Sequence, residues 1–330
     1  MKRIYLLLVL PFLLVCSANL PPKQCGEGGY SHFVNFPEVL RSAEMCSYAY
    51  KSDEEIQERY GDSNRLYIKT VEETDIKYFI IYEDRNNKQH IVIRGTASFS
   101  NVKTDGKYKK VKNDKLSTFD SDIIDQTVKK NKKLDIWVHR GFNKAGNSVY
   151  DDIIENNLLE KRNYLTTVQG HSLGGAAALI VYLQLYTDEI DLGMLYTFGQ
   201  PKALVTDGVL KFRCIPCIRF VNEDDMIPCV PPSKFAFGLF TSIPLWRHGF
   251  YRHLGDEVIL LKDSNYVYLE YHDAERLNVT SFWKKLGKQQ LSIHDHHIPE
   301  YLKNLEMKKD IITERDFRKR RKYKTKDKYK

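Results

Sequence analysis

The stretch VQGHSLGG at residues 168–175 decides the fold of this chain. Residues 164–169 (YLTTVQ) are rich in β-branched side chains and predict a strand, whereas residues 176–186 are rich in helix formers. Glycines stand two positions before and after Ser172, where a Cβ would collide with the neighbouring elements. This pattern is typical of a nucleophile elbow, a sharp strand-to-helix turn that lifts the serine hydroxyl above the strand ends.

The helix that follows the turn adds a second chemical feature. The backbone N–H of Leu173 stands at its start, where a developing oxyanion is stabilised by the helix dipole. A chance GxSxG in a Gly/Ser-rich turn is the alternative, and the strand before and the helix after argue against it. The turn therefore predicts a reactive Ser172 with Leu173 as an oxyanion donor.

Helical and strand patterns alternate along most of the 330 residues. Helices are predicted at residues 36–50, 53–60 and 142–159, and strands at 77–83, 89–94, 194–198, 218–221, 257–261 and 266–271. This order predicts an α/β fold with a mostly parallel central sheet and helices on both faces. Residues 106–135 form a polar, lysine-rich insertion, which predicts a lid or a mobile connection.

The amino-terminal residues carry the pattern of an export signal. Lys2 and Arg3 precede an apolar run at residues 4–15, too short to span a bilayer, and small residues follow. We expect a signal peptide at residues 1–18; the alternative is a lipoprotein with Cys16 as its lipidated first residue. Both predict a secreted or cell-envelope protein. Residues 19–312 are expected to form a single domain.

Residues 313–330 are expected to form a basic, disordered tail. From residue 315 onward it holds ten Lys or Arg and two Asp, so its net charge equals the +8 of the whole chain. The tail is either a solvated appendage or a means of adsorbing to an anionic lipid surface. No nucleic-acid-binding pattern accompanies the charge, so nucleic acid is not an expected partner.

Six cysteines are present, and export would permit disulfides. Cys25 and Cys46 are a plausible clamp for the amino-terminal segment. Cys214 and Cys217 have the spacing of a redox or zinc motif but lack a second such pair, which favours buried thiols or a disulfide over a metal.

Five segments in a fixed order resemble those of the class 3 lipases, the fungal-lipase-like branch of the α/β-hydrolases. They are IRGT at 93–96, VHRGF at 138–142, GHSLG at 170–174, YTFGQP at 196–201 and RFVNEDDMIP at 219–228. The resemblance implies that Thr96 is the second oxyanion donor. Val102 stands where the family usually has tryptophan, which puts the usual short lid in doubt.

The resemblance also selects the acid and the base. The acid segment implies Asp225 rather than its neighbour Asp224, since a buried carboxylate at a strand end holds the imidazole tautomer. Four histidines are candidate bases: His253, His294, His296 and His297. The family places the base just before a terminal helix, which implies His296 in DHHIPEYL, whereas His253 fits a hairpin motif outside the triad.

These residues predict serine-dependent hydrolysis of acyl esters through an acyl-enzyme, with Ser172, Asp225 and His296 as the triad. The resemblance implies lipid esters as substrates, either triacylglycerol or phospholipid, and the chemistry requires no cofactor and no metal. One alternative is a soluble-ester esterase or thioesterase, which the polar insertion favours. Another is a catalytically silent lipase fold used for surface binding, against which the complete elbow and acid segments argue.

Overall fold

The computed structural model describes residues 34–95, 109–119, 135–160, 164–212, 214–231, 251–270, 274, 292–309 and 313–314. The expected signal peptide, Cys16, Cys25, Thr96 and the tail beyond residue 314 lie outside these ranges. Within them, no helix is both long enough and apolar enough to cross a membrane.

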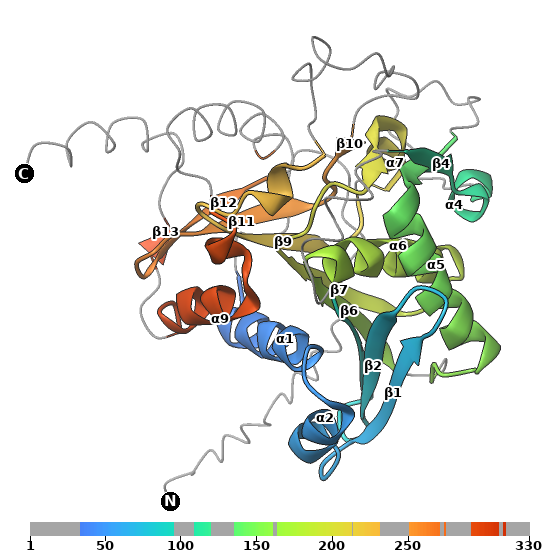
Figure 1. Ribbon diagram of the computed structural model, residues 1–330, viewed down its shortest axis with the longest axis horizontal. Coiled ribbons are helices and arrows are strands. Elements are labelled where there is room, and N and C mark those ends of the chain that lie inside the picture. The colour runs from blue at the N-terminus through green and yellow to red at the C-terminus, as the bar shows by residue number, and fades with distance from the viewer. Residues whose placement is uncertain are drawn as a thin grey trace, which may run out of the picture.

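A nine-stranded sheet, counted over the described ranges, forms the centre of the molecule (Figure 1). In spatial order its strands are β1 (Arg65–Val71), β2 (Ile76–Glu83), β3 (Lys88–Ile93), β6 (Leu165–His171), β7 (Leu192–Phe198), β9 (Cys217–Asn222), β11 (Asp256–Leu260), β12 (Asn265–Leu269) and β13 (Thr313–Glu314). The five strands from β3 to β11 are parallel to one another, and antiparallel strands pair with both ends of this group. The predicted α/β fold with a mostly parallel central sheet is confirmed.

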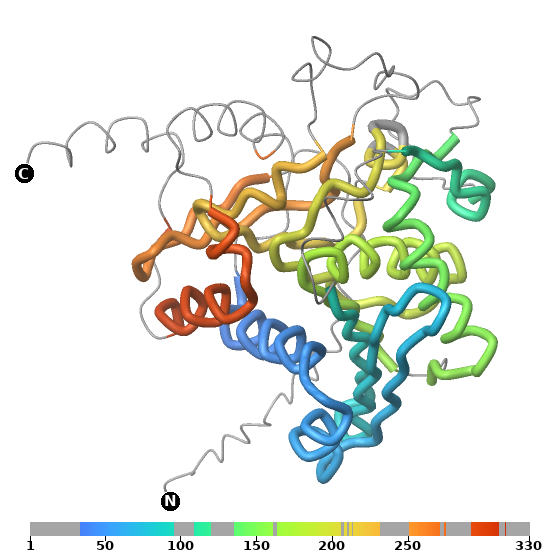
Figure 2. Tube along the Cα trace, viewed as in Figure 1, coloured from blue at the N-terminus to red at the C-terminus, as the bar shows by residue number. Residues whose placement is uncertain are grey.

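Helices cover both faces of the sheet because its buried strands are apolar on both sides. In β2, Tyr78 and Ile80 pack in the cluster that includes α5 (Arg140–Glu155) and α6 (Leu173–Thr187). The alternate residues Phe79 and Ile81 pack in a second cluster with α1 (Phe36–Tyr48) and α9 (Ile298–Glu306). Figure 2 shows α1 and α9 side by side, although they come from opposite ends of the described chain.

A smaller sheet lies beside the main one, and one of its strands comes from the polar insertion. Its strands are β10 (Tyr251–Arg252), β8 (Leu204–Val205), β5 (Trp137–His139) and β4 (Lys110–Lys112). The short helix α4 (Asp114–Thr118) follows β4 and buries Leu116 completely. Lys211 in α7 (Thr206–Phe212) donates from Nζ to the Leu116 carbonyl at 2.8 Å. Residues 109–119 of the insertion are therefore part of the packed body rather than a mobile connection.

Some elements match the predictions, and others differ for identifiable reasons. The helix α2 (Asp53–Tyr60) has the predicted bounds, and its capping box on Ser52 explains why the start was clear from sequence. Strand β1 was not predicted, because it is an edge strand with no fully buried residue and so lacks a clear apolar alternation. Strand β13 pairs with β12, so the sheet takes the first two residues of the expected tail.

The predicted Cys25–Cys46 disulfide is wrong. Cys46 is a free thiol, fully buried on the core side of α1. That burial raises the pKa of its thiol, which makes it an unreactive core residue. Cys214, by contrast, is disulfide-bonded.

Candidate active site

Ser172 occupies the predicted turn between β6 and α6. Its backbone has φ 59° and ψ −129°, a strained conformation for a residue with a side chain. A Cβ on Gly170 would lie 2.3 Å from the Gly174 carbonyl oxygen, and one on Gly174 would lie 2.2 Å from the Ile93 carbonyl oxygen. The Ser172 N–H donates to the Phe198 carbonyl at 2.9 Å, which anchors the turn to β7. Close backbone packing thus enforces the elbow.

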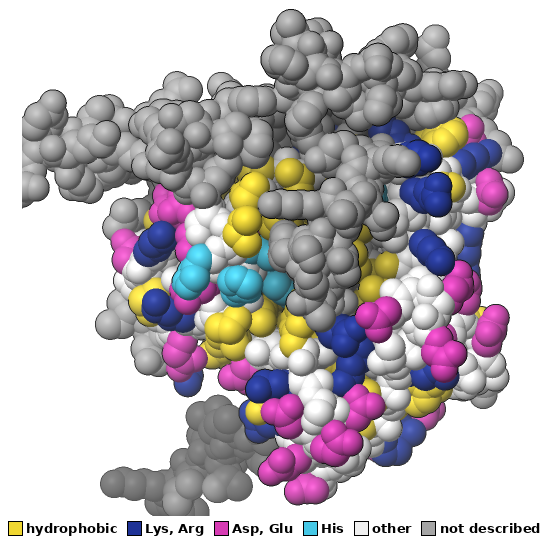
Figure 3. All heavy atoms as spheres, in the orientation of Figure 1, with side chains coloured by type: hydrophobic (Ala, Val, Ile, Leu, Met, Phe, Trp, Pro, Cys, Tyr) yellow, Lys and Arg dark blue, Asp and Glu magenta, His cyan; other side chains and the backbone are white. Residues whose placement is uncertain are grey.

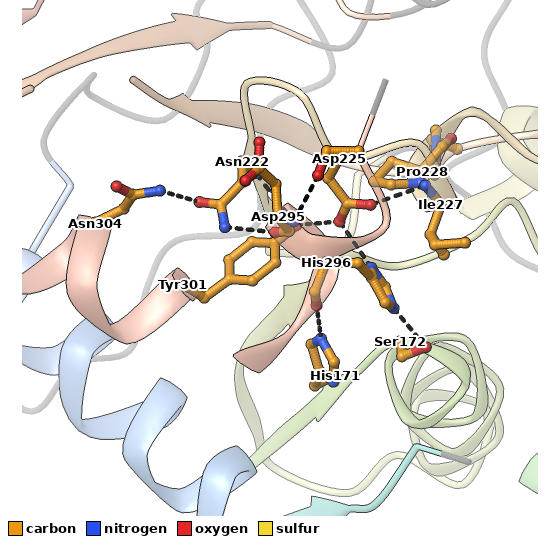
Figure 4. A network of polar contacts seen from close by, with 12 residues as sticks. His171, Ser172, Asn222, Asp225, Ile227, Pro228, Asp295, His296, Tyr301 and Asn304 are labelled. Carbon is orange, nitrogen blue, oxygen red and sulfur yellow. Dashed lines mark hydrogen bonds and ion pairs between the residues drawn. The ribbon is translucent and has the colours of Figure 1, made fainter. Parts of the chain in front are cut away.

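The structure brings Ser172, His296 and Asp225 together from three separate segments (Figure 4). His296 Nε2 lies 2.8 Å from Ser172 Oγ, and His296 Nδ1 lies 2.8 Å from Asp225 Oδ2. Asp225 follows β9, and His296 ends the short 3-10 helix η2 (His294–His296) just before α9. At most 4% of any of the three residues is exposed, so water competes little for these hydrogen bonds.

The carboxylate of Asp225 accepts two further hydrogen bonds. The Ile227 N–H donates to Oδ1 at 2.8 Å, and the Tyr301 hydroxyl donates to Oδ2 at 2.6 Å. Burial, followed by the nearby Asp225 charge, raises the pKa of Tyr301 well above its usual value, so the phenol stays protonated and remains a donor. These contacts orient the carboxylate towards the imidazole.

Asn222, at the end of β9, ties the acid and base segments together. Its Nδ2 donates to the Asp295 carbonyl at 2.7 Å, and its Oδ1 accepts from Asn304 Nδ2 in α9 at 2.8 Å. The Ser292 N–H also donates to the Asp224 carbonyl at 2.8 Å. The loop that carries His296 is therefore fixed against the loop that carries Asp225.

The alternative acid and bases lie elsewhere. Asp224 faces outward, where a carboxylate oxygen lies 3.2 Å from Lys262 Nζ. His253 is buried, and its Nε2 lies 2.7 Å from the Pro228 carbonyl oxygen. His294 and His297 are exposed on either side of His296, and Figure 3 shows histidine side chains beside hydrophobic ones on this face. None of these residues lies between Ser172 and Asp225.

Of the two predicted oxyanion donors, only Leu173 is described. It is the first residue of α6, so its N–H has no partner within the helix. Thr96 lies outside the described residues, but its neighbour Gly95 ends close to the elbow: a Cβ on Gly95 would lie 3.1 Å from Ser172 Cβ. The segment just after β3 therefore approaches the serine from the side of the predicted second donor.

Two features of the site were missed from sequence. Tyr301 was not singled out as a site residue, although a buried tyrosine needs a hydrogen-bond partner. Gly199 has φ 59°, and a Cβ there would lie 2.8 Å from His296 Cε1 and 2.9 Å from Asp225 Oδ2. The TFGQP turn carried this signal, since a glycine just after a buried strand indicates a close approach.

A serine hydroxyl that donates to an imidazole, itself oriented by a buried carboxylate, can act as a nucleophile. Over the described ranges, no group of three or more His, Cys, Asp or Glu residues could hold a metal ion. The fold and this arrangement define the class: an α/β-hydrolase with a Ser-His-Asp site.

Comparisons with known proteins place the chain within that class. The family described as lipase (class 3) matches residues 90–235. A lipase of Rhizomucor miehei is 36% identical over 115 residues, which cover 30% of this chain and 30% of that protein. A lipase of Rhizopus niveus is 29% identical over 189 residues, which cover 52% of this chain and 42% of that protein. Residues 90–235 are therefore similar to the class 3 lipases, and the chain spans less than half the length of these relatives.

Solved structures show the same fold. The triacylglyceride lipase of Rhizomucor miehei superposes with a TM-score of 0.52 at 23% identity, over 68% of this chain and 79% of that chain. A fungal lipase in complex with an inhibitor has a TM-score of 0.55 at 23% identity, over 79% of this chain and 92% of that chain. The fold is that of the fungal lipases.

Proposed function

We propose that this protein is a serine-dependent carboxylic ester hydrolase that cleaves acyl esters of lipids. Ser172 is the nucleophile, His296 the general base and acid, and Asp225 the orienting carboxylate. The observation that carries the proposal is the buried line of hydrogen bonds from Ser172 Oγ through both nitrogens of His296 to Asp225. The match to the class 3 lipase family supports it.

The proton positions follow from the donors and acceptors. Asp225 can only accept, so His296 carries its proton on Nδ1 and presents the Nε2 lone pair to the Ser172 hydroxyl. His296 takes the hydroxyl proton as Ser172 attacks the ester carbonyl, and the N–H groups of Leu173 and Thr96 receive the oxyanion. His296 then protonates the leaving alcohol. The resulting acyl-enzyme is hydrolysed by a water molecule that His296 deprotonates, which releases the acid.

The names of the relatives support a lipid substrate. The curated relatives are described as lipases, and the solved Rhizomucor miehei structure is described as a triacylglyceride lipase. Triacylglycerol or phospholipid is therefore the substrate class that we propose. The export pattern at residues 1–18 supports action outside the cytoplasm, and the basic tail supports adsorption to an anionic membrane surface.

A serine-reactive phosphonate ester tests the reaction class. We expect it to label the wild-type protein once, and Ser172→Ala to abolish labelling and lower ester turnover by about 10⁴-fold or more at an unchanged melting temperature. Ser148→Ala, which removes a hydroxyl in α5 that hydrogen-bonds Thr74, is the matched control and should label normally. Activity of Ser172→Ala within about tenfold of wild type would contradict the serine mechanism.

The acyl preference separates the remaining alternatives. Rates are compared for short-chain soluble esters, emulsified triacylglycerol and phospholipid vesicles. Faster hydrolysis of the long-chain lipids supports a lipase, whereas activity on the soluble esters alone identifies an esterase. No hydrolysis and no labelling would identify a silent fold.

A further inference from the structure

We propose that His171 and Tyr50 form a positioning pair that holds three segments of the site in register. These segments are the residues just after β3 that include Gly95, the elbow that carries Ser172, and the loop that carries His296. The proposal rests on the proposed function, because it explains how the reacting groups keep their alignment. Neither residue touches the reacting atoms, so neither is a catalytic residue.

His171 uses both of its ring nitrogens. It ends β6 next to Ser172 and is buried. Its Nε2 lies 2.7 Å from the backbone carbonyl oxygen of His296, and its Nδ1 lies 2.8 Å from the Tyr50 hydroxyl (Figure 4 shows the first contact). A buried imidazole costs free energy unless both nitrogens have partners, and here both have one.

The direction of each hydrogen bond follows from this geometry. A carbonyl oxygen only accepts, so His171 carries a proton on Nε2. Burial, and then the nearby His296, lowers the pKa of His171 well below its usual value, so the ring is neutral and Nδ1 accepts from the Tyr50 hydroxyl. The tautomer of His171 is thus the opposite of that of His296, whose proton sits on Nδ1.

Tyr50 extends these contacts to the oxyanion side. It stands just after α1, and its hydroxyl packs against Gly95. The hydroxyl lies so close that a Cβ on Gly95 would come within 2.3 Å of it. Gly95 directly precedes Thr96, the proposed second oxyanion donor. Gly95 therefore packs on the Tyr50 hydroxyl, which is hydrogen-bonded through His171 to the His296 carbonyl.

His171 also limits how the base can move. The rings of His171 and His296 have centroids 4.8 Å apart with an interplanar angle of 32°. The carbonyl contact fixes the backbone of the base, and the ring contact supports its side chain beside Ser172. Misplacing a catalytic group by about 1 Å can cost about 10²-fold in rate, so losing this support should lower kcat.

Three substitutions of His171 separate its two contacts. His171→Gln keeps an amide donor near the Nε2 position, His171→Asn keeps a polar group near the Nδ1 position, and His171→Leu removes both. We expect His171→Leu and His171→Asn to lower kcat on a soluble ester by about 10²-fold, and His171→Gln to stay within about tenfold of wild type. KM should change little in all three. Equal loss in all three variants, or a rise in KM at constant kcat, would overturn the proposal.

Tyr50→Phe tests the other end without changing side-chain volume. We expect kcat about tenfold lower, because His171 Nδ1 loses its hydrogen-bond partner and Gly95 loses a close contact. Tyr60→Phe is the matched control: it removes a buried hydroxyl that has no hydrogen-bond partner among the described residues, and it should leave kcat unchanged. Wild-type kcat in Tyr50→Phe would overturn the proposal.

Nitrogen-15 NMR of the histidine rings gives a readout that does not need activity. We expect His171 as the Nε2–H tautomer in wild type, and a shift of the His296 ring signals in Tyr50→Phe but not in Tyr60→Phe. An Nδ1–H tautomer, or unchanged His296 signals, would refute the pair. If wild type neither hydrolyses esters nor reacts with the phosphonate, the proposed function fails, and these spectra still decide whether the pair positions His296.

Discussion

Two buried histidines, His296 and His253, share most of their local features and differ in the group that each one contacts. His296 is 1% exposed and His253 is fully buried, and Nε2 of each has a partner within 2.8 Å. The partner of His296 is the Ser172 hydroxyl, which can give up a proton. The partner of His253 is the Pro228 carbonyl, which can only accept one. Burial alone therefore does not make a histidine a base. The group that contacts its Nε2 decides whether it can accept a proton.

The charged groups near the two rings also differ: a carboxylate lies beside His296, whereas cations lie near His253. His296 faces the Asp225 carboxylate, which stabilises the imidazolium that forms when Ser172 reacts. Burial, then the positive charges of Arg219 and Lys202, lowers the pKa of His253 well below its usual value. The nearby carboxylate of Glu257 binds Arg219 at 2.9 Å. His253 is thus held neutral and serves to fix the loop at Pro228.

The largest expected effect comes from exchanging each histidine for asparagine. His296→Asn should lower kcat by about 10⁴-fold or more at a nearly unchanged melting temperature, because it removes the base from a formed site. His253→Asn should keep kcat within about tenfold and lose about 1–3 kcal/mol of stability, because it disturbs a buried hydrogen bond. Turnover and thermal unfolding of both variants check this. The reverse pattern would show that the base has been misassigned.

The ion pair beside His253 should matter for stability and not for chemistry. Arg219 and Glu257 are both almost completely buried, so Arg219→Met removes the cation paired with a buried carboxylate and should cost about 3–5 kcal/mol. Arg59→Met, at an exposed pair with Glu44, is the control and should cost less than about 0.5 kcal/mol. Chemical denaturation measures both. A loss of kcat in folded Arg219→Met would mean that this cluster also supports the site.

A third buried histidine predicts how stability depends on pH. Burial, followed by the charges of Arg41 and Lys88, lowers the pKa of His90 to about 3. Below pH 6.5 the unfolded chain therefore binds a proton at His90 that the folded chain does not. The free energy of unfolding therefore decreases as the pH is lowered. This residue accounts for a loss of about 2 kcal/mol between pH 7 and pH 5. Urea unfolding of wild type and His90→Gln at both pH values measures this. The free energy of unfolding of the variant should change less between pH 7 and pH 5 by that amount. An equal change in both proteins would contradict a neutral His90 in the folded chain.

The smallest effect is expected from the tail, which contains neither histidine. Deleting residues 315–330 should weaken binding to anionic vesicles about tenfold at low salt, with less effect at high salt. Turnover of a soluble short-chain ester should stay unchanged. Co-sedimentation with anionic vesicles measures the binding, and neutral vesicles are the control. Unchanged binding after the deletion would show that the tail is only a solvated appendage.

Local sequence determined the parts of this protein that depend on local sterics and periodicity. The glycines around Ser172 predicted the elbow because no other residue fits between β6, α6 and the end of β3. Alternating patterns predicted the parallel sheet and its helices because the buried faces must be apolar. The edge strand β1 was not predicted, since a strand without a buried face does not need an alternating apolar pattern.

Only the tertiary structure decided which distant residues meet. The sequence offered four histidines and two adjacent aspartates, and the resemblance to a family, rather than any local pattern, singled out His296 and Asp225. The folded chain brings them to Ser172 because Asn222 and Tyr301 join the end of β9 to the segment before α9. The links from Tyr50 to His171 and from Tyr301 to Asp225 span 121 and 76 residues, and the thiol of Cys46 is turned into the core. No pattern within one element records such contacts, because they depend on how the elements pack.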